Sequence, residues 1–267
     1  MTAPIPRLPK KLLKTAIRTM ARYRMVNAGD RVLLGLSGGK DSLTLLHLLR
    51  HVQRHAPFSF ELAAVTIDPQ TPEFSPAALK DYLAQLGVTY HYVEAPIVEL
   101  AGEHMRGDSY CAFCARMKRG LMYKTAREHG YNVLALGQHL DDIAESFLMS
   151  AFHGGKLNTM KLHYLNDAGD VRIIRPLALM RERQLRDFAA EAGLPVIHEN
   201  CPACFSKPTE RQRMKLLLAG EEGEHPMLFK SLGQALRPLM EEGLARALER
   251  IGTPPGQPSG ECEGRLT

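Results

Sequence analysis

The sequence predicts an α/β protein built on a five-stranded parallel sheet that is flanked by helices. Short apolar runs alternate along the chain with longer segments of helical periodicity. This alternation is typical of parallel strands joined by right-handed crossover helices. Two of the runs, 31–36 and 132–136, are almost continuously apolar, as strands covered on both faces are. The chain has 267 residues, of which 45% are hydrophobic, and this is enough to enclose such a core.

The predicted elements follow one another in the order that such a sheet requires. The strands are expected at 31–36, 61–67, 89–93, 132–136 and 171–174. The helices between and after them are expected at 41–54, 76–86, 115–129, 140–152 and 181–192. Residues 153–170 contain two adjacent glycines and the stretch Asn-Asp-Ala-Gly-Asp, which favour a loop or a short hairpin before the last strand.

Helical extensions are expected at both ends of the sheet domain. Basic residues recur at helical spacing near the N-terminus, with Leu13, Ile17 and Met20 on another side, which fits nucleic acid, a membrane surface or an ordinary solvated face. Two segments near the C-terminus also have helical patterns, and the Pro- and Gly-rich end is predicted to be disordered. These C-terminal helices are expected at 209–219 and 226–250. The resulting division is 1–28 for the basic helix, 29–200 for the sheet domain, 201–250 for the C-terminal helices and 251–267 for the tail.

Charge and hydropathy limit where the protein acts. The net charge is +5, a mild excess that is concentrated in the first segment. No apolar run approaches the length that spans a bilayer, and the N-terminus lacks an apolar core followed by a small-residue cleavage site. We therefore expect a cytoplasmic protein.

The stretch Ser-Gly-Gly-Lys-Asp-Ser follows the first predicted strand and directly precedes a helix. Its two glycines suit a turn at which backbone approaches a ligand, and the free N–H groups of the helix start attract anions. Lys40 adds a positive charge and the two serines add hydroxyl donors. The spacing of neither the Walker A nor the Rossmann glycine motif is present, so a different kind of phosphate site is predicted. The alternative is a strand-to-helix turn that binds nothing.

A second polar stretch, Gly-Gln-His-Leu-Asp-Asp, follows the predicted strand 132–136. In a doubly wound sheet this strand neighbours the first one, so both stretches open onto one crevice. Asp141 and Asp142 could hold Mg²⁺ beside phosphates, or they could simply complement the helix dipole. Asp68 ends the second predicted strand, where it could reach nucleotide hydroxyls or remain a solvated loop residue.

Four of the five cysteines form two Cys-x-x-Cys pairs, Cys111 with Cys114 and Cys201 with Cys204. A closed Cys₄ zinc site, a redox dithiol and an iron–sulfur cluster all use such pairs. Cys262 stands alone in the tail and receives no role.

Basic residues lie close to these motifs. They could contact an RNA backbone or form a solvated helix face. Those after the first cysteine pair are Arg116, Lys118, Arg119, Lys124 and Arg127. Arg175, Arg211 and Arg213 could contact a nucleotide or RNA phosphate.

The motifs in their order resemble those of a known family. Ser-Gly-Gly-Lys-Asp-Ser resembles the PP-loop of the N-type ATP pyrophosphatases. The motifs that come after it are similar to those of the TtcA family. In order, they are Cys-x-x-Cys-x-Arg-x-Lys-Arg-Gly, Gly-Gln-His-Leu-Asp-Asp, Phe-His-Gly-Gly-Lys, Ile-Arg-Pro-Leu and a second cysteine pair near Arg-Gln-Arg. This similarity runs from about residue 10 to about residue 220. Gln138 departs from the family pattern, which has histidine there, and this puts a proton-transfer role at that position in doubt.

The resemblance implies an adenine-nucleotide α-hydrolase fold and ATP-dependent tRNA thiolation, with formation of 2-thiocytidine at position 32 through an adenylated base. It implies a [4Fe–4S] cluster held by Cys111, Cys114 and Cys204, with Cys201 as the alternative third ligand, and an open iron site that carries the sulfur. The implied partners are tRNA, a sulfide or persulfide donor such as a cysteine desulfurase, and a second copy in a homodimer. Two rivals stay open: a PP-loop thiolase for a uridine or another acceptor, and a PP-loop protein with a structural Cys₄ zinc site.

The residue patterns and the resemblance together assign roles to single residues, in three groups. The catalytic candidates are Lys40, Asp41 and Asp141. The candidates for binding ATP and Mg²⁺ are Ser37, Gly38, Gly39, Lys40, Asp41, Ser42, Asp68, Gly137, His139 and Asp142. The candidates for binding tRNA are Lys11, Lys14, Arg18, Arg116, Lys118 and Arg119.

Overall fold

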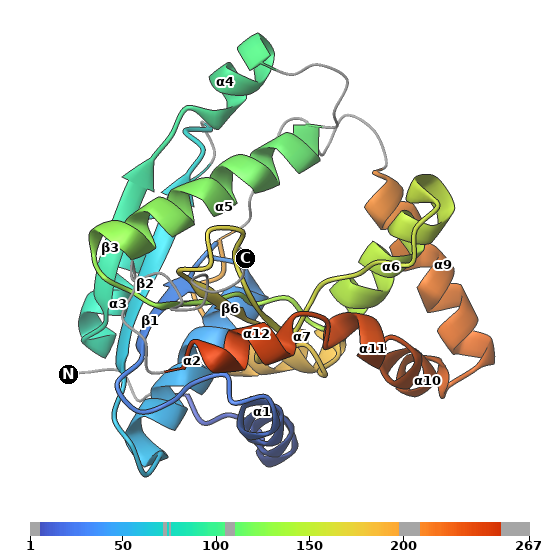
Figure 1. Ribbon diagram of the computed structural model, residues 1–267, viewed down its shortest axis with the longest axis horizontal. Coiled ribbons are helices and arrows are strands. Elements are labelled where there is room, and N and C mark those ends of the chain that lie inside the picture. Colours follow the sequence, from blue (N-terminus) through green and yellow to red (C-terminus); the bar gives the residue numbers. More distant parts are fainter. Residues whose placement is uncertain (1–5, 72–73, 75, 105–109, 198–208, 252–267) are drawn as a thin grey trace, which may run out of the picture.

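The computed structural model describes residues 6–71, 74, 76–104, 110–197 and 209–251 (Figure 1). Its centre is a six-stranded sheet in the order β3-β2-β1-β4-β6-β5. The strands are β1 (Arg31–Gly35), β2 (Glu61–Asp68), β3 (Thr89–Glu94), β4 (Val133–Ala135), β5 (His163–Leu165) and β6 (Arg172–Ile174). All pairs are parallel except that of β5 with β6. The five predicted parallel strands are therefore confirmed, and the chain order changes direction between β1 and β4.

The sixth strand, β5, is a correction to the predicted five. It forms a hairpin with β6, whose turn is closed by Asn166. The side-chain oxygen of Asn166 accepts hydrogen bonds from the N–H groups of Asp170 and Val171, and Gly169 adopts a positive φ of 71°. The turn chemistry was visible in the sequence, but three residues are too few to give a strand pattern.

The described helices are α1 (Lys10–Arg22), α2 (Lys40–His55), α3 (Ala77–Leu86), α4 (Ile97–His104), α5 (Tyr110–Glu128), α6 (Leu140–Gly154), α7 (Glu182–Glu191), α9 (Glu210–Glu224), α10 (Leu228–Ala235), α11 (Arg237–Met240) and α12 (Leu244–Glu249). The sequence missed α4. It also predicted one helix over 226–250, where three short ones occur. Pro238 lacks the N–H that would continue α10, and Gly243 adopts a positive φ of 79° before α12.

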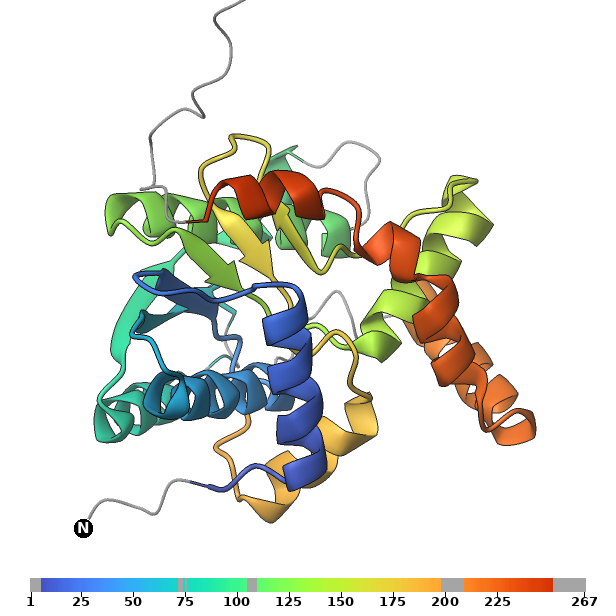
Figure 2. The ribbon, with the colours of Figure 1, turned by 60° about the horizontal axis from the view of Figure 1, so that its bottom comes forward.

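The two faces of the sheet are covered by different helices (Figures 1 and 2). Along β1, Val32 and Leu34 contribute to the core shared with α1, α2, α3 and α7, whereas Leu33 contributes to the core shared with α5. This alternation follows from the two-residue period of a strand. Among the described residues, no helix is both long and apolar enough to cross a membrane.

The N-terminal helix α1 is packed onto the body of the protein. Leu12, Ala16 and Met20 are buried in the same core as α2, while Ile17 is 41% exposed. The buried side of this helix thus lies about one position N-terminal to the apolar side predicted from the sequence, except that Met20 belongs to both. The basic side chains of α1 remain on its exposed face, as expected.

Helices α6, α9 and α10 form a side of the molecule that stands beside the sheet body (Figures 1 and 2). Helix α9 packs against α6, and a small separate core joins Leu140, Ala144, Leu218 and Phe229. The predicted disordered tail lies outside the described residues, apart from Ile251.

Candidate functional site

The Ser-Gly-Gly-Lys-Asp-Ser stretch forms the turn between β1 and α2, which begins at Lys40. Gly38 has a positive φ of 88°, and its carbonyl oxygen accepts a 2.9 Å hydrogen bond from the N–H of Ile197. Gly39 is the N-cap of α2 and supplies no side chain to satisfy the first N–H groups. These groups are therefore available to an anion at the start of the helix.

The two serines shape this loop from within. The hydroxyl of Ser42 donates to the carbonyl oxygen of Gly39 at 3.0 Å, and the hydroxyl of Ser37 accepts from the N–H of Gly39 at 3.3 Å. The two hydroxyl oxygens lie 3.3 Å apart. The six predicted loop residues are thus brought together in one turn.

Lys40 and Asp41 place opposite charges at the mouth of the loop. Lys40 Nζ lies 3.2 Å from Asp41 Oδ2 and 2.9 Å from Glu182 Oε1. The other carboxylate oxygen of Asp41, Oδ1, is buried and has no hydrogen-bond partner among the described residues. Burial raises the pKa of Asp41, although His139 and Lys40 oppose the shift. An oxygen left in this state is ready to bind a cation.

The second wall of the crevice follows β4. Gly137 lies against the start of α2: an added Cβ would come within 3.2 Å of Asp41 C and Ser42 N. Only glycine allows this approach without moving the loop. The pairing of β1 with β4 confirms the prediction that the two polar stretches follow neighbouring strands and so lie side by side at one edge of the sheet.

His139 holds the acidic side chains of this wall in place. It is 3% exposed and caps α6. Its ring Nδ1 accepts a hydrogen bond from the backbone N–H of Asp142 at 3.3 Å, and its backbone N–H donates to Asp142 Oδ2 at 3.0 Å. Because Nδ1 accepts, the proton of the neutral ring is assigned to Nε2. Nε2 lies 3.7 Å from Asp41 Oδ2, so the ring connects the two walls.

The two aspartates of the second stretch differ in their surroundings. Asp141 accepts from Arg181 at 3.0 to 3.2 Å and from the N–H of Glu182 at 2.8 Å, so both of its oxygens are used to order the start of α7. Its catalytic role stays a prediction. Asp142 pairs through Oδ1 with Arg211 at 3.2 Å and remains close to the loop through His139.

Asp68 is buried at the end of β2, 7% exposed. It accepts from the hydroxyl of Tyr92 and, at 2.7 Å, from the N–H of Gln70. Its two oxygens each have a partner in this structure, and the predicted nucleotide contact stays a prediction.

Four side chains of the second wall were missed by the sequence reasoning. Arg181 bridges Asp141 and Glu222, with Nη2 donating to Glu222 Oε2 at 2.7 Å, and its guanidinium lies 3.3 Å from the centroid of the Phe229 ring. Glu182 pairs with Lys40 and also, at 2.6 Å, with Lys215. The sequence Arg-Glu-Arg at 181–183 looks like the charged, exposed start of a helix, and only the folded structure shows which partners these side chains contact.

Burial raises the pKa of Glu145 to about 7, helped by Asp142 and opposed by Arg211. This side chain is 4% exposed and lies on α6 behind the second wall. Nη1 of Arg211 lies 3.9 Å from its Oε2.

Gln138 and Arg175 support the loop before α6. Arg175 Nε donates to Gln138 Oε1 at 2.9 Å, and its Nη1 donates to the carbonyl oxygen of Lys161. Arg175 is 4% exposed, so its predicted contact with nucleotide or tRNA phosphate is not supported. The glutamine in place of histidine acts as the acceptor for this arginine.

The first cysteine pair lies inside α5, not ahead of it as predicted, because the helix begins at Tyr110. Residues three apart share a helix face, so Cys111 and Cys114 are on one side of the first turn. Cys114 is half-buried against the α5 core, beside Met117. The side chain of Cys111 and all of Cys201, Cys204 and Cys262 lie outside the described residues.

These residues fit the implied groups to different degrees. Two cysteines three positions apart in one helix are donors of the kind that an iron–sulfur cluster uses, and the second pair lies outside the described residues. For Mg²⁺, Asp41 offers an unsatisfied oxygen and Asp142 lies near it. No three His, Cys, Asp or Glu side chains in the described part of the chain are placed to enclose a metal. Mg²⁺ does not need three, since it is usually held by one or two carboxylates together with phosphates.

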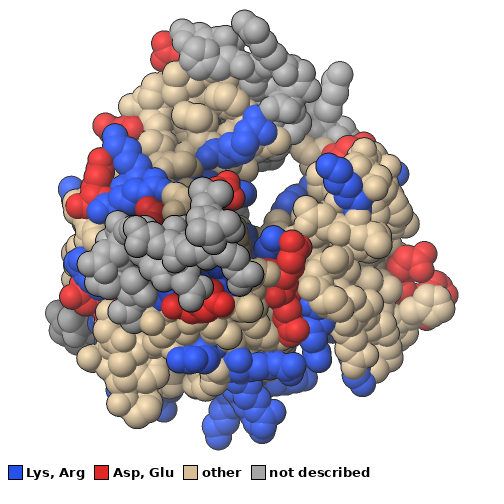
Figure 3. All heavy atoms as spheres, viewed as in Figure 1, with Lys and Arg blue, Asp and Glu red and all other residues tan. Residues whose placement is uncertain are grey.

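The predicted tRNA contacts fall into two separate groups. Lys11, Lys14 and Arg18 are exposed on α1, on the α2 side of the sheet. Arg116, Lys118 and Arg119 lie on α5, on the other side. Figure 3 shows lysine and arginine side chains around α1 and over α5, and between α5 and the α6–α9 side it shows a hollow. The structure does not bring the two groups together.

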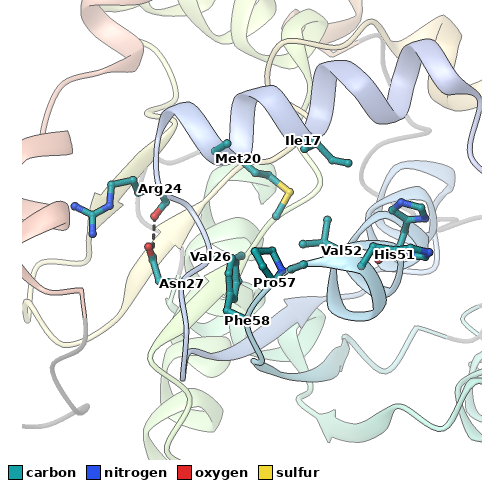
Figure 4. A pocket seen from close by; sticks show the side chains of 12 residues that line it. Ile17, Met20, Arg24, Val26, Asn27, His51, Val52, Pro57 and Phe58 are labelled. Carbon is teal, nitrogen blue, oxygen red and sulfur yellow. Dashed lines mark hydrogen bonds between the residues drawn. The ribbon is translucent and has the colours of Figure 1, made fainter.

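A cavity of about 380 Å³ lies between the end of α1 and the end of α2 (Figure 4). Its lining is mostly apolar and includes Ile17, Met20, Val52 and Phe58. Because α2 starts at the PP-loop and this cavity is at its other end, the cavity is separate from the site.

Comparison with known proteins agrees with the geometry. The PP-loop domain family matches residues 10–215. The tRNA-cytidine(32) 2-sulfurtransferase of Geobacter sulfurreducens is 41% identical over 228 residues, covering 85% of this chain and 89% of the relative. The one of Vibrio cholerae is 36% identical over 241 residues, covering 90% of this chain and 77% of the relative.

A solved structure has the same fold. The U34-tRNA thiolase NcsA from Methanococcus maripaludis, determined with its [4Fe–4S] cluster, superposes with a TM-score of 0.70 at 24% identity, covering 87% of this chain and 78% of that one. The matching motifs, the PP-loop crevice and the extent of these similarities lead to one conclusion: this chain belongs to the tRNA-cytidine(32) 2-sulfurtransferase family of PP-loop proteins.

Proposed function

We propose that this protein uses ATP to convert cytidine 32 of tRNA into 2-thiocytidine. The observation that carries the proposal is the site at the carboxyl ends of β1 and β4, where an uncapped helix start, Lys40 and the unsatisfied oxygen of Asp41 lie together. The relatives that match nearly the whole chain carry the corresponding name and support the choice of acceptor. We also propose that the reaction takes place in the cytoplasm, where tRNA and ATP are both present.

The first step activates the base. The O2 oxygen of cytidine attacks the α-phosphorus of ATP, the bond from that phosphorus to the bridging oxygen breaks, and pyrophosphate leaves with this oxygen. The N–H groups at the start of α2 and the ammonium group of Lys40 hold the pyrophosphate and stabilise its charge. These donors are fixed by the loop, so they need no rearrangement as charge develops.

Asp41 and Asp142 are the residues that would hold Mg²⁺, with the remaining ligands supplied by phosphate oxygens and water. His139 orients both carboxylates. Asp141 acts indirectly, because it orders the start of α7 by accepting hydrogen bonds from Arg181 and from the N–H of Glu182.

The second step replaces oxygen by sulfur. Sulfide attacks C2, the C2–O2 bond breaks, and AMP leaves with O2. AMP is a good leaving group, whereas the oxygen of an unactivated base is a poor one. Cys111 and Cys114, with Cys204 or Cys201, would hold a [4Fe–4S] cluster, which when bound would supply the sulfur. A sulfide or persulfide donor such as a cysteine desulfurase would refill it.

The exposed basic side chains of α5 are proposed to contact the tRNA backbone close to the cysteines. Those of α1 are too far round the sheet to act at the same phosphates, and they would contact a different part of the tRNA or a second molecule. A homodimer would bring two such surfaces together, and we keep it as the proposed assembly.

The acceptor is tested by reconstitution under anaerobic conditions. Cluster-loaded protein, Mg²⁺-ATP and sulfide are incubated with a tRNA transcript that has cytidine at position 32 and with a matched transcript that has uridine there. We expect 2-thiocytidine, detected by mass spectrometry of nucleosides, only in the first transcript. Thiolation of a uridine would contradict the choice of acceptor. One zinc per chain with no iron or labile sulfide after anaerobic purification would contradict the cluster.

A further inference from the structure

One carboxylate joins the PP-loop to a helix late in the chain. Glu182, the first residue of α7, forms two ion pairs: its Oε1 lies 2.9 Å from Lys40 Nζ and its Oε2 lies 2.6 Å from Lys215 Nζ. Lys40 belongs to the PP-loop and Lys215 to α9. The Glu182 side chain is 22% exposed, and the lysine at each of its two oxygens keeps it charged: burial alone would raise its pKa, but Lys215 and Lys40 lower it to about 2.

A charged Glu182 is unfavourable for a bound nucleotide in two ways. It competes with phosphate for Lys40, whose ammonium group it already contacts. Any phosphate that Lys40 reaches also lies within a few ångströms of this carboxylate, where like charges repel, most strongly when solvent is partly excluded. The site therefore needs a second cation to offset Glu182.

We propose that Lys215 is that cation and acts as a positioning residue for ATP. It neutralises Glu182 and so leaves Lys40 available to the phosphates. It does not touch the nucleotide itself. The inference rests on the proposed function only in taking ATP as the ligand of the PP-loop.

Helix α9 is seated so that Lys215 can do this. Met214 and Leu218, on either side of Lys215 in the sequence, are both buried, and Leu218 packs with Leu140 of α6 and Phe229 of α10. Arg211 pairs with Asp142 at 3.2 Å, and Glu222 pairs with Arg181 at 2.7 Å. Contacts before and after Lys215 thus fix α9 against α6 and the start of α7.

Binding linkage gives a second consequence. If Lys215 strengthens the binding of ATP, then ATP strengthens the seating of α9 by the same factor. The helix that follows the second cysteine pair in the chain would then report on whether the phosphate site is filled.

The first test measures the affinity of Mg²⁺-ATP for the cluster-loaded protein. We expect Lys215→Met to weaken binding by about tenfold, within the usual range of such coupling. Lys215→Arg keeps the charge and should bind within about twofold of wild type. Adding Glu182→Gln to Lys215→Met should restore binding, because the carboxylate that needed neutralising is gone. Lys230→Met, on the exposed face of α10, is the matched control and should change nothing.

Two results would overturn the inference. One is a Lys215→Met protein that binds ATP like wild type. The other is failure of Glu182→Gln to rescue it, which would mean that Lys215 contacts the nucleotide or serves stability alone. If Lys215→Met does not fold, Glu182→Gln by itself decides: we expect it to bind ATP at least as tightly as wild type, and weaker binding contradicts the idea.

Kinetics and hydrogen exchange separate positioning from structure. Lys215→Met should raise the KM for ATP and leave kcat unchanged. Mg²⁺-ATP should slow amide exchange over 210–224 in wild type but not in Lys215→Met. A wild-type protein that binds no ATP would contradict the proposed function. A wild type that binds ATP, with all variants behaving alike, would contradict this inference alone.

Discussion

The PP-loop and the facing wall formed by α6, α7 and α9 border the same crevice, but their residues are held in different ways. The PP-loop is one contiguous turn whose shape comes mainly from glycine backbone and from hydrogen bonds between residues at most five positions apart, with one distant bond from the N–H of Ile197 to the carbonyl oxygen of Gly38. The facing wall depends on ion pairs between residues that lie 33 to 69 positions apart, such as Glu182 with Lys215 and Asp142 with Arg211. The first wall is a product of local sequence, and the second exists only after the fold has formed.

This difference predicts how each wall fails. A change in the PP-loop should remove donors from the phosphate and affect catalysis directly. A change in the ion pairs should first loosen α7 and α9, and so affect stability and affinity. The four predictions that follow are ordered from the largest expected effect to the smallest.

Replacement of Lys40 by Met should have the largest effect. The ammonium group is the only lysine or arginine charge that the described PP-loop residues 37–42 supply, so release of pyrophosphate should fall by about 10²- to 10³-fold. The measurement is tRNA-dependent pyrophosphate release at saturating ATP. The control is Lys80→Met on the exposed side of α3. A Lys40→Met protein with wild-type turnover would break the assignment of the first wall.

Replacement of Arg181 by Ala should destabilise the protein by about 3 kcal/mol, because it leaves Asp141 and Glu222 charged without their partner. Arg183 contacts the same Glu222 but is 59% exposed, so Arg183→Ala should cost less than about 1 kcal/mol. Urea unfolding of the two variants measures the difference. Equal costs would show that the second wall is not held by its buried ion pairs.

The stability of the second wall should depend on pH through Glu145. The pKa of this group is raised to about 7 in the folded protein, so folding is favoured while it is protonated and loses that advantage as the pH rises from about 4.5 through 7. At pH 8, Glu145→Gln should therefore be more stable than wild type by about 2 kcal/mol, and the gain should shrink toward pH 5.5.

Urea unfolding at both pH values, with the exposed Glu221→Gln as control, checks the role of Glu145. If Glu145→Gln lost stability equally at both pH values, the buried carboxylate would have a favourable partner and the sign of the prediction would be wrong.

Replacement of Gly137 by Ala tests the contact between the walls. The new Cβ would press on the backbone of Asp41 and Ser42, and we expect a loss of about 1–3 kcal/mol together with weaker ATP binding. Gly220 lies in α9 with open space around it, so Gly220→Ala should instead stabilise by about 0.5–1 kcal/mol. Calorimetric melting compares them. If Gly137→Ala changed neither the melting temperature nor ATP binding, Gly137 would not lie in close contact with the start of α2.

The comparison of the walls also explains what could be predicted from sequence. The PP-loop, the parallel strands and the meeting of the two polar stretches follow from local patterns and from the rules of parallel sheets. Arg181, Glu182, Lys215 and Glu222 carry no such pattern, because charged residues at a helix start look the same whether they face solvent or one another. Helix α4 was missed because it is short, only eight residues, and directly follows a proline.

The central claim is that this crevice splits ATP between the α and β phosphates to activate a tRNA cytidine. The most direct measurement quantifies AMP, pyrophosphate and 2-thiocytidine in one reaction with cytidine-32 tRNA, Mg²⁺-ATP and sulfide. The account predicts equal amounts of the three products, none without tRNA, and a strong reduction with Lys40→Met. Formation of ADP and phosphate, or of 2-thiocytidine without pyrophosphate, would contradict it.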